Sequence, residues 1–292
     1  MEAVRVFVGT DRSQLLAVKV LEHSIKRHAS LPVEVIPMCD LPIRVPKDPR
    51  QTQRTGFSFS RFCIPALAGY RGRAIYMDAD MLVMKDIREL WELDFKGAKV
   101  IVQEELSQEQ SHTALKLGAP GKRAKQCAVM VMDCARLDWR IDDIIGGLDE
   151  ARYDYQGLMF DLCLLKEPEI RYAVPFRWNS LEHLDATTCN IHYTDMSTQP
   201  WVFPLNRNAE VWYEEVRLML KEGALGRAEV EEQIRLGYFR PSLLRDLEGR
   251  SRVSGALGFV LRSWQFLADR AKGFVPHREV YMAKRARQAA GR

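Results

Sequence analysis

The stretch RAIYMDADMLVM, residues 73–84, places two carboxylates one residue apart behind a short apolar run. The apolar run predicts a buried β-strand. Side chains alternate between the two sides of an extended segment, so Asp78 and Asp80 point the same way and Ala79 points the opposite way. Two parallel carboxylates this close repel each other unless a cation lies between them. The stretch therefore predicts a strand that leads into a cation site.

Divalent metal ions suit such a pair of carboxylates. Mn²⁺ and Mg²⁺ bind carboxylate oxygens and commonly keep a phosphate as a further ligand, so a metal-bridged diphosphate is the simplest use for the pair. A structural alternative is that one carboxylate caps the next turn and the other pairs with Arg73 or Lys85. Ligands of α/β proteins bind beyond the carboxyl ends of strands, and this position favours the metal site.

A layered α/β fold is predicted by the segments around this strand. The first three elements follow the order strand, helix, strand, which is typical of such a fold. We expect strands at residues 4–9, 33–38, 99–104 and 127–133, and helices at residues 13–29, 139–149 and 155–165. Because strands and helices stop alternating strictly after Arg136, we expect a mixed central sheet rather than a purely doubly wound one.

The first predicted strand ends in Gly9, Thr10 and Asp11. Thr10 and Asp11 could face the same crevice as the two aspartates and accept hydrogen bonds from a nucleobase or a ribose. The alternative for Asp11 is an N-cap on the helix that follows, which its spacing also fits.

The net charge of +4 hides an asymmetry between the two parts of the chain. From Arg240 onward there are twelve Lys or Arg and four Asp or Glu, a net charge of +8, so residues 1–239 carry −4. A mildly acidic body with a basic end favours an enzyme that meets an anionic surface through that end, and we expect no nucleic-acid partner. The alternative is that the basic end is simply solvated.

The six cysteines are scattered without a C-x-x-C pair, which excludes a zinc ribbon and a dithiol redox motif. The first residues lack the pattern of a secretory signal, and no apolar run is long enough to span a bilayer. We therefore expect a cytoplasmic protein, with a peripheral position on the inner face of the plasma membrane as a further expectation.

Five motifs, GTD, SFSRF, YMDADMLV, YQGLM and HYTDMSTQPW, occur in this order. In order and spacing they resemble glycosyltransferase family 8, the family of glycogenin and of bacterial lipopolysaccharide sugar transferases. The resemblance implies a single GT-A domain, Rossmann-like with a mixed central sheet, a UDP-sugar donor, a Mn²⁺ cofactor and retention of the anomeric configuration; Mg²⁺ is the other candidate metal. We expect this domain over residues 1–239 and a basic amphipathic helical extension over residues 240–292.

The resemblance also implies a metal site and a donor site. His192 opens the HYTDMSTQPW segment and corresponds to the third metal ligand beside Asp78 and Asp80, with a purely structural histidine as the alternative. Ala79 belongs to the same donor-binding motif. Arg61 corresponds to the basic residue that contacts the donor, with an exposed surface arginine as the alternative. Gln199 stands where the family has a lysine that helps to neutralise the diphosphate, so Arg61 or Arg54 could compensate.

Two motifs that contact the sugar depart from the family pattern. Gln126 and Cys127 stand where Asn-Ser is usual, and Gln156 matches the Gln of Asp-Gln-Gly, while the acidic residue is displaced to Asp154. An amide is a poor nucleophile, so we expect Gln156 to orient the sugar during a same-face attack guided by the leaving phosphate. The alternative for Gln156 is a buried amide that holds a loop.

Two other interpretations remain beside a sugar transferase. The altered motifs allow a nucleotide-sugar-binding protein that has lost turnover. Haloacid-dehalogenase-like phosphatases also place D-x-D after an apolar strand, but near the start of the chain and with Thr or Val where this chain has Leu82.

The segment RVSGALGFVLRSWQFLADRAKGFV, residues 252–275, combines large apolar residues with arginines. A basic amphipathic helix of this type can lie on an anionic bilayer and bring the enzyme to a lipid-linked or envelope acceptor. The alternatives are a helix that packs on the body of the protein and an acceptor that is a free glycan or a small molecule.

Overall fold

The computed structural model describes residues 3–53, 55, 57–104, 126–249, 255–278 and 282. The strand predicted from the paired aspartates, β3 (Arg73–Asp78), lies inside a six-stranded sheet of order β2-β1-β3-β6-β5-β7. The other strands are β1 (Val4–Gly9), β2 (Val33–Met38), β5 (Val100–Gln103), β6 (Val129–Asp133) and β7 (Ile170–Val174). β1 is parallel to β2 and β3, whereas β6 is antiparallel to β3 and β5. The sheet is therefore mixed, as expected.

A smaller sheet begins where β3 ends. It has three strands in the order β4-β9-β8, formed by β4 (Met81–Val83), β8 (Ser180–Leu181) and β9 (Asn190–His192). Only Ala79 and Asp80 separate β3 from β4, so the two aspartates occupy the joint between the sheets. Met81 is the register partner of His192, which brings the end of β9 to the same joint.

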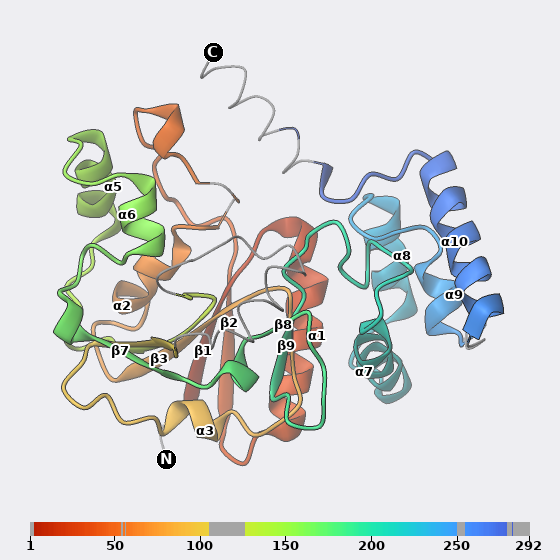
Figure 1. Ribbon diagram of the computed structural model, residues 1–292, viewed down its shortest axis with the longest axis horizontal. Helices are drawn as coiled ribbons and strands as arrows, with labels where there is room; N and C mark the ends of the chain where they lie inside the picture. The colour runs from red at the N-terminus through yellow and green to blue at the C-terminus, as the bar shows by residue number, and fades with distance from the viewer. Residues whose placement is uncertain are drawn as a thin grey trace.

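Helices cover both faces of the large sheet, and the strand residues divide between them with period two (Figure 1). Val6 and Val8 pack with α1 (Leu15–His28), while Phe7 faces the opposite core. That second core also contains side chains from α2 (Ile64–Leu67), α5 (Ile141–Asp149) and α6 (Tyr155–Phe160). Helix α6 ends five residues earlier than predicted, because Leu162 adopts a left-handed conformation with φ of 48°.

A third layer packs on the outer side of α1 (Figure 1). It comprises α7 (Ala209–Glu222), α8 (Arg227–Arg235), α9 (Leu243–Leu247) and α10 (Gly255–Ala271). Trp201, Trp212 and Phe239 form its core, with ring centroids 5.3 to 6.2 Å apart. Phe274 joins the same core. The domain boundary at Arg240 stays a prediction.

Shorter elements complete the description. They are α3 (Arg88–Trp91) and the 3₁₀ helices η1 (Arg12–Gln14), η2 (Pro49–Gln51), η3 (Ser60–Cys63), η4 (Glu167–Glu169) and η5 (Phe176–Trp178). Among the helices of the described residues, none combines the length and the apolarity that crossing a bilayer requires.

Candidate metal centre

Asp78, Asp80 and His192 converge at the joint between the two sheets. One ligand atom from each residue lies within 4.8 Å of those of the other two. Ala79, between the aspartates, points into the core on the α1 side of the sheet. The alternation expected for an extended segment is thus present, and the predicted three residues form one cluster. Two carboxylates and an imidazole are a suitable ligand set for Mn²⁺ or a similar divalent ion.

His192 is held in one orientation by buried amides. Its Nδ1 donates to Asn179 Oδ1 at 2.7 Å, and Asn179 Nδ2 donates to Gln103 Oε1 at 2.6 Å. The other ring nitrogen, Nε2, lies 3.1 Å from Asp80 Oδ1. Burial lowers the pKa of His192, but Asp80 and Asp78 outweigh it and the pKa is raised. Because Nδ1 carries the donated hydrogen, Nε2 is the nitrogen available to a metal ion.

Asp78 is flanked by a phenol and a guanidinium. Tyr76 donates to Asp78 Oδ1 at 2.5 Å, and Arg61 lies 3.7 Å from the same oxygen. Burial raises the pKa of Asp78, the Asp80 charge raises it further, and Arg61 opposes both. Burial also raises the pKa of Tyr76 well above its ordinary value, so Tyr76 remains a hydrogen-bond donor.

Arg61 lies on η3 and is buried rather than on the surface. Its guanidinium donates to the carbonyl oxygen of Cys127 at 2.8 Å and to the Tyr76 hydroxyl at 3.2 Å. It also stacks over the Tyr76 ring, 4.6 Å from the centroid. Arg61 therefore supplies a fixed positive charge beside Asp78; its contact with a donor stays a prediction. Arg54 lies outside the described residues.

Gln199 is fully buried and connects the metal cluster to the C-terminal part of the chain. Its amide nitrogen donates to Asp80 Oδ2 at 2.9 Å and to the Tyr193 carbonyl oxygen at 3.1 Å. Its amide oxygen accepts from His277 Nε2 at 2.7 Å. The family's lysine position is thus occupied by a neutral glutamine, which holds Asp80 through a hydrogen bond to its carboxylate.

Thr10 and Asp11 follow β1 beside the cluster, since Gly9 is the register partner of Asp78. Asp11 Oδ1 accepts from the backbone nitrogen of Ser13 at 2.9 Å and from its hydroxyl at 2.6 Å, which makes Asp11 the N-cap of η1. The capping role is confirmed. Thr10 is buried, and its hydroxyl donates to the Asp11 carbonyl oxygen at 3.1 Å. Contacts with a nucleotide stay predictions for both residues.

Comparison with known proteins identifies similar sequences for the part of the chain that carries the two aspartates. Residues 8–146 match glycosyl transferase family 8. This is the family that the motifs resemble, and the match includes the two aspartates but ends before His192 and Gln199. Protein CDI of Arabidopsis thaliana is 38% identical over 112 residues, which are 37% of this chain and 43% of that protein. The chain therefore spans less than half the length of this relative.

Solved structures share the fold. The glycosyltransferase GlyE of Streptococcus pneumoniae superposes with a TM-score of 0.54 at 14% identity, over 83% of this chain and 66% of GlyE. The galactosyltransferase LgtC, solved with donor and acceptor sugar analogues, gives 0.52 at 16% identity, over 76% of this chain and 96% of LgtC. The chain therefore has the GT-A fold that the resemblance implies.

The family's sugar-contact motifs occupy two different places. Cys127 lies next to Arg61, and the Ala128 carbonyl oxygen accepts from the backbone nitrogen of Asp78 at 3.2 Å, so this segment borders the cluster. Gln126 precedes it and accepts from the backbone of Gln103. These positions agree with a role near the donor, which stays a prediction.

Asp154 and Gln156 lie at the start of α6. Asp154 Oδ1 accepts from the backbone nitrogen of Gly157 at 2.7 Å, so Asp154 is the N-cap of this helix. Gln156 is exposed, which argues against a buried loop-holding amide. Within the described residues, neither side chain contacts the metal cluster. Their catalytic roles stay predictions.

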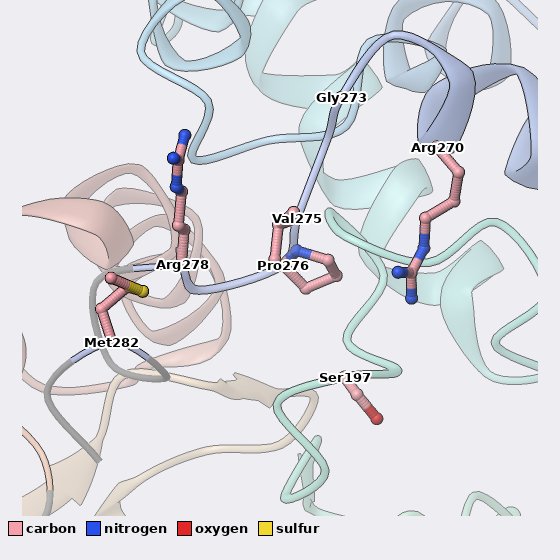
Figure 2. A pocket seen from close by; sticks show the side chains of 7 residues that line it. All are labelled: Ser197, Arg270, Gly273, Val275, Pro276, Arg278 and Met282. Carbon is pink, nitrogen blue, oxygen red and sulfur yellow. The ribbon is translucent and has the colours of Figure 1, made fainter. Parts of the chain in front are cut away.

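A hollow of 580 Å³ opens beside the loop that carries Gln199. Figure 2 shows Ser197 of that loop and Arg270 of α10 on one side of the hollow and Arg278 on the other. Arg278 directly follows His277, the residue that binds Gln199. Two cations thus border the loop whose expected lysine is absent.

Tyr76, Asn179 and His277 belong to the site but were not predicted. Tyr76 lies two residues before Asp78 on the same side of β3, a spacing that could have identified it. Asn179 and His277 lack such a signal, because they reach the site only through the packing of distant segments.

Proposed function

We propose that this protein is a metal-dependent glycosyltransferase that moves a hexose or a related sugar from a UDP-sugar to an acceptor. The observation that carries the proposal is the Asp78, Asp80 and His192 cluster at the joint between two sheets of a GT-A fold. The match of residues 8–146 to glycosyl transferase family 8 supports the reaction class.

The residues present fit a Mn²⁺ or Mg²⁺ ion. Asp78 and Asp80 would supply carboxylate oxygens, and His192 would supply Nε2, already oriented through Asn179. When bound there, the ion would supply positive charge that stabilises the negative charge of the leaving diphosphate. Gln199 and Tyr76 hold the two carboxylates in place through the hydrogen bonds described above.

We assign the remaining roles by position. Thr10, Asp11 and Arg61 would bind the nucleotide side of the donor, and Gln126 and Cys127 the sugar side. Gln156 would orient the sugar for a retaining, same-face transfer, with Asp154 fixing the turn on which Gln156 lies. Arg278 beside His277 would supply the positive charge that Gln199 lacks.

The acceptor in this proposal is a glycan, a lipid-linked sugar or a small molecule. A cytoplasmic location forms part of the proposal, and it is supported by the six cysteines, which form no disulfide in the described part of the chain.

Release of UDP from a panel of UDP-sugars, with Mn²⁺, with Mg²⁺ and with a chelator, tests the proposal. We expect release to require the metal and to fall at least roughly a hundredfold in Asp80→Asn, because the cluster then loses a charged ligand. Asp138→Asn is the matched control, since Asp138 is exposed before α5.

Two results would contradict the proposal. Full activity of Asp80→Asn would remove the metal assignment. Metal-dependent UDP binding without release from any UDP-sugar, with or without acceptors, would favour the alternative of a nucleotide-sugar-binding protein without turnover.

A further inference from the structure

Helix α10 packs on the protein through two polar side chains and through Phe266, whose ring lies 5.4 Å from that of Phe203. Gln265 and Asp269 are buried on its inner side. Asp269 accepts from the backbone nitrogen of Ser242 at 2.9 Å and from its hydroxyl at 2.6 Å. Gln265 donates to Asp246 Oδ1 at 3.4 Å, and Asp246 pairs with the buried Arg240. A polar network therefore fixes which side of α10 faces the body.

The outer side of α10 is apolar. Of the thirteen large apolar side chains exposed in the described residues, six belong to this helix. Trp264 is 69% exposed, Leu267 63% and Leu257 61%. Residues 257, 260, 264 and 267 recur at helical spacing, so they form one continuous stripe. A surface helix usually turns its large apolar side chains inward, whereas most of those of α10 are exposed.

Positive charge lies on one side of this stripe. Arg245 of α9 and Lys272, just after α10, are exposed beside it, whereas the acidic residue of α10, Asp269, is buried and hydrogen-bonded. A hollow of 660 Å³ beside the stripe is lined by Arg245, Trp264 and Lys272 together with neighbouring residues. Cations beside an exposed tryptophan fit a surface that presents anionic headgroups above an apolar layer.

We propose that the outer face of α10 docks on an anionic lipid bilayer. Trp264, Leu267 and Leu257 would enter the boundary of the acyl chains, and Arg245 and Lys272 would lie among the headgroup phosphates. Figure 1 shows α10 on the outside of the helical layer, at the edge of the molecule away from α5 and α6. The acidic body, residues 1–239 with a net charge of −4, would stay off the membrane.

A second copy of the chain fits this face less well than a bilayer. In a two-fold contact through the stripe, the cations beside it would face their own copies without an exposed acidic partner on the helix. In an anionic bilayer, the acyl chains would cover the apolar stripe and the headgroup phosphates would pair with the cations. The proposal concerns lipid binding and does not depend on the proposed transferase activity.

Sedimentation of the full chain with vesicles tests the docking. Neutral phosphatidylcholine vesicles are compared with vesicles that also contain phosphatidylserine, at low and at high salt. We expect binding to the anionic vesicles that weakens with salt, and a loss of at least roughly tenfold in the double variant Trp264→Glu/Leu267→Glu. Val45→Glu/Leu67→Glu is the matched control, because it adds the same charges at exposed apolar positions away from α10.

Tryptophan fluorescence reports whether α10 itself enters the lipid. Trp139, Trp178, Trp201 and Trp212 are buried and Trp91 is half-buried, so most of a blue shift on addition of anionic vesicles should come from the exposed Trp264. We expect Trp264→Phe to bind vesicles while losing most of this shift.

Three outcomes would overturn the proposal. They are equal binding to neutral and anionic vesicles, undiminished binding by Trp264→Glu/Leu267→Glu, and a wild-type dimer that this variant dissociates while the wild type binds no vesicles. The last outcome would show an interface between copies. Because the assay contains neither metal nor sugar nucleotide, its result is independent of the test of transferase activity.

Discussion

At the scale of single residues, Asp80 is the most connected member of the site. His192 and Gln199 contact its two carboxylate oxygens, and its backbone oxygen accepts from Tyr193 at 2.8 Å. Gln199 in turn binds His277, so the geometry of one metal ligand depends on a residue that follows α10. Gln199 therefore supports Asp80 through hydrogen bonds rather than through charge.

Replacing Gln199 by Ala should therefore impair both stability and metal binding. The variant removes a hydrogen bond from Asp80 and leaves His277 Nε2 without an acceptor, at a cost of about 1–3 kcal/mol in the free energy of unfolding. Loss of such a supporting contact should weaken Mn²⁺ binding roughly 10- to 100-fold. Denaturant unfolding and Mn²⁺ titration measure the two effects.

Gln156→Ala provides the control for stability, since Gln156 is exposed and its removal should change the unfolding free energy by less than about 0.5 kcal/mol. Unchanged Mn²⁺ affinity in Gln199→Ala would show that Gln199 does not position Asp80.

At the scale of elements, the β3-to-β4 joint and helix α10 are the informative features. The joint is short, since only two residues separate the end of β3 from the start of β4 in the small sheet. The pairing of β4 with β9 then brings His192 to the aspartates. Helix α10 contacts the body through the polar Gln265 and Asp269 and through Phe266, while most of its large apolar side chains are exposed.

Asp269→Ala should loosen α10 selectively. The Ser242 backbone nitrogen and hydroxyl both lose their acceptor, so we expect a destabilisation of about 1–3 kcal/mol and faster hydrogen exchange of the α10 amides. Leu267→Ala, on the exposed side of the same helix, should change stability by less than about 0.5 kcal/mol. Equal exchange rates in Asp269→Ala and wild type would contradict the anchoring role.

At the scale of the whole molecule, an aromatic core joins the third layer to the α/β body. Trp212 of α7 lies 5.3 Å from Trp201 and 6.1 Å from Phe239, and the same cluster includes Leu16 and Val20 of α1. Because Trp201 closely follows Gln199 in the chain, the packing of this layer also supports the metal cluster.

Trp212→Ala should destabilise the protein by roughly 3–5 kcal/mol, the usual cost of deleting a buried tryptophan side chain. Trp264→Ala is the matched control, and as an exposed residue it should cost less than about 0.5 kcal/mol. Chemical unfolding followed by circular dichroism measures both. A Trp212 variant as stable as the Trp264 variant would show that this core does not hold the layer to the body.

The sequence by itself determined five of the six strands of the large sheet, the alternation at Asp78 and Asp80 and, through the order of its motifs, the pairing of these residues with His192. These features depend on local periodicity and on short motifs. Only the tertiary structure decided which distant groups support them, including Asn179 and His277. It also decided which face of α10 points outward, because Asp269 and Gln265 bind Ser242 and Asp246 and Phe266 packs on Phe203, contacts that local sequence patterns do not specify.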